Sequence, residues 1–318
     1  ITDTEISRNT ASASGGGLSM NVNSTVTLDR VEIADNEADS VGGGVFARDS
    51  ALTATRTTIS DNSAIGNGGG IHADLSTVIS LTSSTISGNH SDSYGGGANL
   101  ANTGGTFIGN STISGNEALV AGALLIGEYD AATIVASTIT ANHLAGPHLP
   151  DPVGGIVVAG GVLPTCVVSI DAGIETLPCS SGGVVTVAGS IVSGNSDADF
   201  GGFLGAHVTV DADHSLLGLF DAAEVSVVDA GGSRTGVTAP QLALGPLADN
   251  GGPTLTHALL PGSIAIDAGP SPVPSFTGSE WDQRGEGYAR VVNGLADVGA
   301  FEVQPPKPEP EPEPTFTG

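Results

Sequence analysis

Basic residues are scarce in this sequence. The 318 residues include 8 Lys and Arg against 34 Asp and Glu, which gives a formal net charge of -26. We therefore expect no nucleic-acid partner, because binding to nucleic acid needs clustered cations. Long apolar runs are also missing: the best, residues 153–163, is interrupted by four glycines. Spanning a bilayer takes about 20 apolar residues, so no direct membrane insertion of this segment is expected.

Aromatic residues and cysteines are few as well. Aromatics make up 4% of the chain, so the apolar residues are mainly Ala, Val, Ile and Leu and the expected core is aliphatic. The two cysteines, Cys166 and Cys179, enclose twelve residues. A disulfide that closes a local loop fits them better than a metal site, because no second Cys pair or HxxxH motif lies nearby.

Glycine and asparagine, in contrast, recur at a fixed period. A unit close to Thr-Ile-Ser-Gly-Asn repeats along the chain, and glycine triplets at 15–17, 42–44, 68–70 and 95–97 keep register with it. The asparagines are spaced by 26 or 27 residues, except that the last follows after 53, which we interpret as one coil that has lost its asparagine. These structural asparagines are Asn9, Asn36, Asn62, Asn89, Asn116, Asn142 and Asn195.

Three short runs of alternating apolar residues fill each repeat, and none has helical spacing. This pattern predicts three strands and three corners per coil. Such a coil buries its apolar face only by stacking on its neighbours, about 4.8 Å apart. The sequence therefore predicts an all-β, right-handed parallel β-helix with coils of about 27 residues. Asparagines should stack at one corner, where Asn tolerates a left-handed conformation, and glycines should supply positive φ at another.

The repeats resemble those of chlamydial polymorphic outer-membrane proteins and of secreted bacterial proteins in the pectate-lyase-like β-helix superfamily. Four ordered motifs near the C-terminus resemble the terminal region of choice-of-anchor Q domain proteins. They are PLADNGGPTLTH at 246–257, PGSIAID at 261–267, DQRG at 282–285 and DVGAF at 297–301. The resemblance implies a secreted or cell-surface bacterial protein and no particular reaction.

The chain divides into three parts. Residues 1–200 hold the β-helix repeats, with an insertion at about 143–180; residues 201–303 hold irregular coils and the choice-of-anchor-like region, which is expected to cap the end of the solenoid. Residues 304–318 form a Pro/Glu-rich linker or tail. Because the first residues already lie inside a repeat, we expect a fragment of a longer chain, with a signal peptide and more coils before it and an anchor or further domain after it.

One regular polar feature is a double column of hydroxyls, expected on the outer face of one sheet. Such a lattice suits a glycan, another cell-surface polymer or ice, although Thr and Ser are also ordinary residues of exposed strands. The binding candidates are Thr58, Ser60, Thr85, Ser87, Thr112, Ser114, Thr138 and Thr140.

Catalytic and metal-binding groups are harder to find. Asp35 and Asp61 should stack on one column, and 197–199 and 211–213 each carry an Asp-Ala-Asp sequence. Lyases on this fold hold calcium with carboxylates, but the spacing here matches no established calcium loop, and ordinary surface roles are the favoured interpretation. The weak calcium candidates are Asp35, Asp61, Asp197, Asp199, Asp211 and Asp213.

These observations favour a non-catalytic, acidic scaffold that is secreted or displayed on a bacterial surface and is adhesive or glycan-binding. No cofactor beyond optional Ca²⁺ is expected, and the expected partners are a glycan or surface polymer and other domains of a longer chain. The alternatives are a polysaccharide lyase or hydrolase and an ice- or crystalline-surface-binding solenoid.

Overall fold

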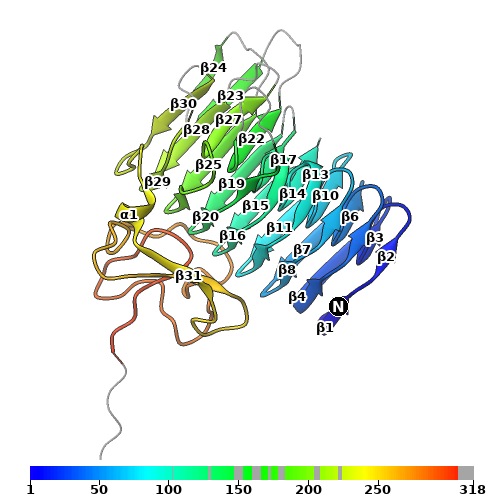
Figure 1. The fold of residues 1–318 in the computed structure, drawn as a ribbon. Coiled ribbons are helices and arrows are strands. Elements are labelled where there is room, and N and C mark those ends of the chain that lie inside the picture. The colour runs from blue at the N-terminus through cyan, green and yellow to red at the C-terminus, as the bar shows by residue number, and fades with distance from the viewer. Residues whose placement is uncertain are drawn as a thin grey trace, which may run out of the picture.

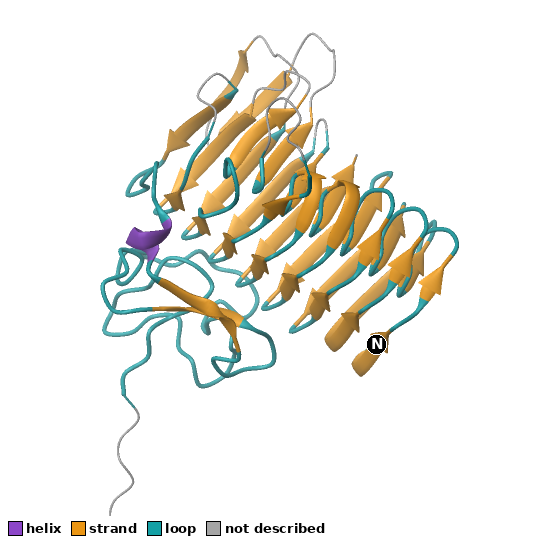
Figure 2. Cartoon of the chain, in the orientation of Figure 1, coloured by secondary structure: helices purple, strands orange, loops and turns teal. Residues whose placement is uncertain are grey.

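A computed structural model describes residues 1–101, 103–127, 130–146, 153–159, 166–170, 173–177, 183–203, 208–220 and 224–306. Within these residues the chain is almost entirely β-strand, wound into a parallel β-helix (Figures 1 and 2). The predicted fold is confirmed. A complete coil contributes to four ladders, which we number in their order along a coil; the three predicted strands per coil correspond to three sheets, one of which contains two ladders. Among the described residues, the last coils contribute fewer strands.

Ladders 1 and 2 belong to one 15-stranded sheet, because the long strand β4 (Thr25–Ala34) runs through both. The other strands of ladder 1 are β7 (Ala51–Thr55), β11 (Val78–Thr82), β15 (Gly105–Gly109), β19 (Ala131–Val135), β25 (Val184–Ala188), β28 (Val208–Asp213) and β30 (Val225–Asp229). Those of ladder 2 are β1 (Thr2–Ser7), β8 (Thr58–Ser60), β12 (Thr85–Ser87), β16 (Thr112–Ser114), β20 (Thr138–Thr140), β26 (Ile191–Val192) and β29 (Leu216–Leu217).

Ladders 3 and 4 form the two remaining sheets of the coil, of six and seven strands. Ladder 3 holds β2 (Thr10–Ala11), β5 (Glu37–Ala38), β9 (Ser63–Ala64), β13 (His90–Tyr94), β17 (Glu117–Val120) and β21 (His143–Leu144). Ladder 4 holds β3 (Leu18–Met20), β6 (Val45–Arg48), β10 (Ile71–Asp74), β14 (Ala98–Ala101), β18 (Leu124–Ile126), β22 (Ile156–Ala159) and β27 (Phe200–Phe203).

Equivalent side chains stack directly over one another. Ile59, Ile86 and Ile113 are paired in register and are at most 2% exposed, inside one continuous aliphatic core. Each buried aliphatic side chain of this kind contributes about 1.5–3 kcal/mol to folding. The vertical register that the period predicts is therefore what fills the interior.

The asparagines form a hydrogen-bonded ladder, as predicted. Asn89 Nδ2 donates to Asn116 Oδ1 at 2.9 Å, and Asn89 Oδ1 in turn accepts from the backbone N–H and Nδ2 of Asn62. The predicted left-handed conformation, however, belongs to the residue before each asparagine, for example Asp61 with φ of 55° and Gly88 with φ of 65°. The side chain can then point into the turn while its own backbone stays in an ordinary conformation.

The interval of 53 residues holds one coil and not two. Asn142 Nδ2 donates directly to Asn195 Oδ1 at 2.7 Å, and β20 pairs with β26 without an intervening strand. The interpretation of a lost asparagine is therefore wrong, because the additional residues leave the coil. Between β22 and β25 they form an antiparallel hairpin of β23 (Cys166–Ile170) and β24 (Gly173–Leu177).

The predicted insertion at 143–180 therefore starts too early, since β21 and β22 still belong to regular coils. Cys166 opens β23 opposite Leu177, whereas Cys179 lies outside the described residues. The disulfide stays a prediction.

Glycine triplets stand at the corner before ladder 4, as predicted. The first glycine of each triplet has positive φ, for example 69° at Gly42 and 72° at Gly68. The middle glycine is required by close approach of neighbouring coils: a Cβ on Gly69 would lie 2.4 Å from the carbonyl oxygen of His90. Side chains are excluded there because the space holds backbone.

The C-terminal region takes a different position from the predicted end cap. Residues up to β30 continue the coils, but α1 (Ala239–Leu242), β31 (Leu244–Ala248), β32 (Thr256–Leu259) and the loops up to residue 303 lie beside the solenoid (Figure 1). They pack there in a separate apolar cluster with Ile191 and Leu216. We call residues 239–303 the lateral cover.

Candidate functional site

The predicted hydroxyl columns exist, and they lie on the outer face of ladder 2. Thr85, Thr112 and Thr138 are in register, and so are Ser87, Ser114 and Thr140. Those six side chains are nevertheless buried, with Thr85 and Thr112 0% exposed, whereas Thr58 and Ser60 are half-buried. The expectation of an exposed lattice is wrong for these six side chains, and four of them, Thr85, Thr112, Ser114 and Thr138, form hydrogen bonds with the lateral cover.

Gln283 is the centre of this contact. Its side-chain Nε2 lies within 3.3 Å of four acceptors, among them the Thr85 hydroxyl at 2.9 Å and the carbonyl oxygen of Ser84, and its Oε1 accepts from the Thr112 hydroxyl at 2.6 Å. The side chain is 0% exposed. The hydroxyls that resembled a ligand lattice thus satisfy a buried amide.

A histidine makes a second contact between the cover and ladder 2. His257 Nδ1 lies 2.8 Å from the Gly245 carbonyl oxygen, and Nε2 lies 2.8 Å from Ser114 Oγ. Because a carbonyl only accepts, Nδ1 carries the proton and Nε2 accepts from the serine hydroxyl. Burial lowers the pKa of His257, which keeps the ring neutral in this arrangement.

An ionic cluster holds the interior of the cover together. Arg284 and Asp282 form an ion pair at 2.6 Å, with side chains 5% and 0% exposed. The Arg284 guanidinium lies between the rings of Tyr288 and Phe301, at 4.0 and 3.8 Å from their centroids. Arg290 donates to Asn110 and to the carbonyl oxygens of Gly299 and Ala300. Every contact here serves packing, because neither arginine is open to a ligand.

Two further carboxyl groups are buried beside the arginines. Burial is the main cause that raises the pKa of Glu302 to about 8; the negative charge of Asp297 contributes to the rise, and the backbone N–H of Asp297, which donates to Glu302, opposes it. Burial also raises the pKa of Asp297, against the effect of the N–H groups of Val303 and Asp267 that it accepts from. Glu302 is 1% exposed. These acids are therefore poised to change the stability of the cover with pH.

The calcium candidates do not assemble into a site. Asp35 and Asp61 are neighbours on one column, and burial raises the pKa of Asp61 with a further contribution from the charge of Asp35. Asp211 and Asp213 lie on β28, with Asp213 paired to His214 at 2.6 Å, and Asp197 has a φ of 60°. Across the described residues, no group of three or more His, Cys, Asp or Glu side chains is placed to hold a metal ion.

Asp199 has a structural role that the sequence did not reveal. Its Oδ1 accepts from the backbone N–H and the Nδ2 of Asn195, and its Oδ2 accepts from the Leu219 N–H at 2.8 Å. A carboxylate suits this place because every neighbouring group donates. Asp199 therefore terminates the asparagine ladder, and both of its carboxylate oxygens accept hydrogen bonds there.

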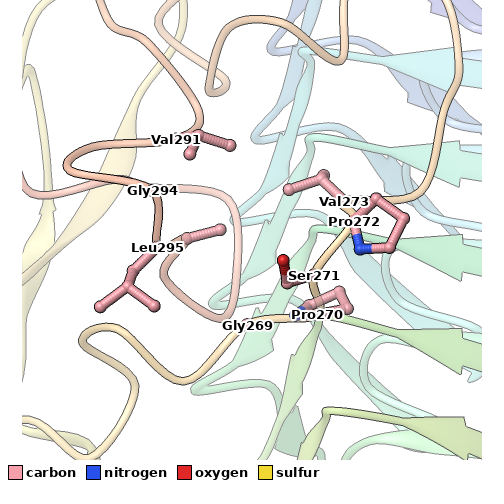
Figure 3. A pocket seen from close by; sticks show the side chains of 9 residues that line it. Gly269, Pro270, Ser271, Pro272, Val273, Val291, Gly294 and Leu295 are labelled. Carbon is pink, nitrogen blue, oxygen red and sulfur yellow. The ribbon is translucent and has the colours of Figure 1, made fainter.

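A shallow hollow of about 270 Å³ lies between two loops of the lateral cover (Figure 3). Pro272, Val273, Val291 and Leu295 contribute apolar side chains to its wall. Its lining residues include no ionisable side chain, so the hollow offers no group for acid–base chemistry.

The exposed hydroxyls lie instead on the outer face of ladder 1, which sequence analysis did not single out. Thr27 and Thr53 are exposed, and Ser80, Thr133 and Thr186 are half-buried in the same column. Phe107 of β15 stands in this column between Ser80 and Thr133. The alternation in residues 51–55 and 78–82 was the available signal, with the aromatic residue as the exception to the pattern.

Comparison with protein families gives one local similarity. Residues 56–74 match the Chlamydia polymorphic membrane protein (Chlamydia_PMP) repeat. The matched segment runs from the corner residue Arg56 through β8 and β9 to the end of β10, so the repeat of that family corresponds here to most of one coil. No curated protein and no solved structure matches the chain. No helix among the described residues has the length and apolar character needed to cross a membrane.

Proposed function

We propose that this chain is a non-catalytic, surface-associated bacterial adhesin, in which a stiff β-helix presents a side face to a cell-surface polymer. The observation that carries the proposal is the match of residues 56–74 to the polymorphic membrane protein repeat on a coil that continues in register with its neighbours. A rigid scaffold with recognition on its surface is the usual arrangement for repeat proteins that bind extended partners.

The proposed surface association rests on the match of residues 56–74 to the repeat. The resemblance of residues 245–301 to choice-of-anchor Q domains supports two further proposals, export from a bacterial cell and anchoring by additional domains. The net charge of -26 supports a partner other than nucleic acid.

The proposal needs neither catalysis nor a cofactor. The Asp282–Arg284 pair is buried in the lateral cover, and Asp199 is engaged by backbone and side-chain donors. The ice-binding alternative relied on Thr85 and Thr112, and burial of both removes their hydroxyls from any ice surface.

An attachment assay tests the function. Beads that carry the 318-residue chain should attach to eukaryotic or bacterial cells more strongly than beads that carry bovine albumin, with equal attachment in EDTA. Digestion of the polysaccharides on the target cells should reduce attachment. Attachment equal to that of the albumin beads would overturn the proposal, and release of unsaturated sugars that absorb near-ultraviolet light would identify a lyase instead.

A further inference from the structure

The outer face of ladder 1 is a strip that the lateral cover leaves partly accessible: most of its outward side chains are half-buried or exposed. Inward residues such as Leu52 and Ala54 are buried in the core, so Ala51, Thr53 and Thr55 point outward from β7. The same alternation holds on the neighbouring strands in parallel register. Successive strands are about 4.8 Å apart, which places one outward row on each coil.

This strip carries no ionisable side chain over five consecutive strands. The outward residues of β7, β11, β15, β19 and β25 are all Gly, Ala, Val, Ser, Thr or Phe, in a chain with a net charge of -26. Acidic residues return only on the flanking strands, with Asp29 on β4 and Asp211 and Asp213 on β28. Asp29 is ion-paired with Arg30 and Arg56, so the strip is a neutral, hydroxyl-bearing surface with an ion-paired border at β4 and an acidic border at β28.

An aromatic pair lies in the middle of the strip. Phe107 contacts Phe276 of the lateral cover, with ring centroids 5.7 Å apart and an interplanar angle of 60°. Gly109 makes this possible, because a Cβ there would lie 2.8 Å from Phe107 Cε1 and 3.2 Å from Phe276 Cε2. Both rings are half-buried, in a chain where aromatic residues make up only 4%.

We propose that this strip binds an uncharged polysaccharide along the helix axis, with one sugar ring stacked on Phe107. A pyranose ring has an apolar face of C–H groups that packs on an aromatic ring, and its edge carries hydroxyls that exchange hydrogen bonds with Ser and Thr. Hydroxyls of Thr53 and Ser80 on one side and of Thr133 and Thr186 on the other extend this site to four further coils. The inference rests on the proposed adhesive function and names its ligand class.

The charge of the chain selects against acidic polymers. A polyuronate lying on the strip would bring its carboxylates towards Asp211 and Asp213 on a chain with a net charge of -26, so repulsion opposes binding at low and moderate salt. A neutral polymer meets no such opposition. Electrostatics therefore contribute specificity here even though the strip itself is uncharged.

The experiment is titration calorimetry of the 318-residue chain with cellohexaose, chitohexaose, mannohexaose and hexagalacturonate. We expect saturable binding of at least one neutral hexamer and none of hexagalacturonate. Phe107→Ala and Thr133→Asp should each weaken binding at least tenfold. Thr10→Asp on the exposed strand β2 adds the same charge outside the strip and should leave binding unchanged.

Thermal unfolding of each variant shows that the fold is retained, and Phe107→Leu separates loss of the ring from loss of packing. The inference would be overturned if no neutral hexamer bound, or if hexagalacturonate bound equally well. It would also be overturned if neither Phe107→Ala nor Thr133→Asp changed the affinity. If cells are still bound when Phe107→Ala and Thr133→Asp have no effect, the adhesive function stands and only this site fails. If the chain binds no cells at all, the proposed function fails first.

Discussion

The hydroxyl of Thr112 donates a hydrogen bond of 2.6 Å to the side-chain carbonyl of Gln283, a residue 171 positions further along the chain. Thr112 belongs to the repeat and Gln283 to the lateral cover, and both are 0% exposed. The outward face of ladder 2 is therefore an internal interface, and its hydroxyls take part in the stability of the fold.

Thr112→Val should destabilise the protein by about 1–3 kcal/mol, because the carbonyl of Gln283 then stays buried without its donor. The change is measured as a lower urea midpoint and as faster proteolysis within residues 244–303. Thr53→Val makes the same chemical change on an exposed strand and should alter the midpoint by less than about 0.5 kcal/mol. Equal effects of the two substitutions would contradict the interface.

The stability of the lateral cover should fall as pH rises. The pKa of Glu302 is about 8 in the folded chain against an ordinary value of 4.5, so between these values the folded state holds a proton that the unfolded state has released. The stabilisation is therefore complete below about pH 4.5 and is lost as pH rises towards 8. The slope for one such group is at most about 1.4 kcal/mol per pH unit.

Urea unfolding at pH 5, 6, 7 and 8 measures this dependence. Glu302→Gln keeps a neutral side chain at every pH and should flatten the curve, whereas the exposed Glu5→Gln should not. General repulsion among the acidic residues also weakens the fold at high pH, so the difference between the two variants is the quantity that tests Glu302.

Asn89→Ala should cost about 2–4 kcal/mol. The substitution removes the acceptor for the Asn62 N–H and Nδ2 and the donor to Asn116 Oδ1 and the Ile59 carbonyl, all of them buried. Chemical unfolding gives the value. Asn21→Ala, at an exposed position outside the ladder, serves as the control and should change stability little. A small effect at Asn89 would mean that water replaces the ladder bonds.

Gly69→Ala should destabilise the coil stack by more than about 2 kcal/mol, since its Cβ would meet two carbonyl oxygens of neighbouring segments within 2.7 Å. At Gly245 the nearest atom to an added Cβ is 3.5 Å away, and φ is not in the left-handed region. Gly245→Ala should therefore be tolerated. Circular dichroism on heating compares the two, and equal melting temperatures would disprove the close-packing argument.

The coil could be predicted from the sequence because its information is local and repeated. The positions of Ile59, Ile86 and Ile113, and of the asparagines beside them, follow from a period that each coil restates. The hairpin between β22 and β25 broke that period, and counting alone could not distinguish an inserted loop from a degenerate coil. The direct hydrogen bond between Asn142 and Asn195 shows that the additional residues are an inserted loop and not a degenerate coil.

The candidate site was much less predictable. Nothing near Thr85 or Thr112 in the sequence shows that a segment almost 200 residues away covers them, because that contact is made by side chains without a repeat of their own. Strand alternation predicts whether a side chain points into the core or outward. Whether an outward side chain is exposed to solvent depends on tertiary contacts. Phe107 departs from its column of Ser and Thr, and that irregularity was the sequence signal for the ladder 1 face.

The lateral cover also changes how the repeats come apart. Stacked repeats with only neighbouring contacts unravel one at a time from an end. Here Gln283, His257 and the backbone of Ala300 bind the strands β12, β16 and β20 to the same lateral cover, and the N–H of Gly299 bonds the carbonyl oxygen of Gly189 before β26. Those coils should open together, while the strands β1 to β3 fray independently. Amide hydrogen exchange of the 318-residue chain should therefore show similar, high protection in these coils and lower protection in the strands β1 to β3. A force applied to the lateral cover would be distributed over several coils at once.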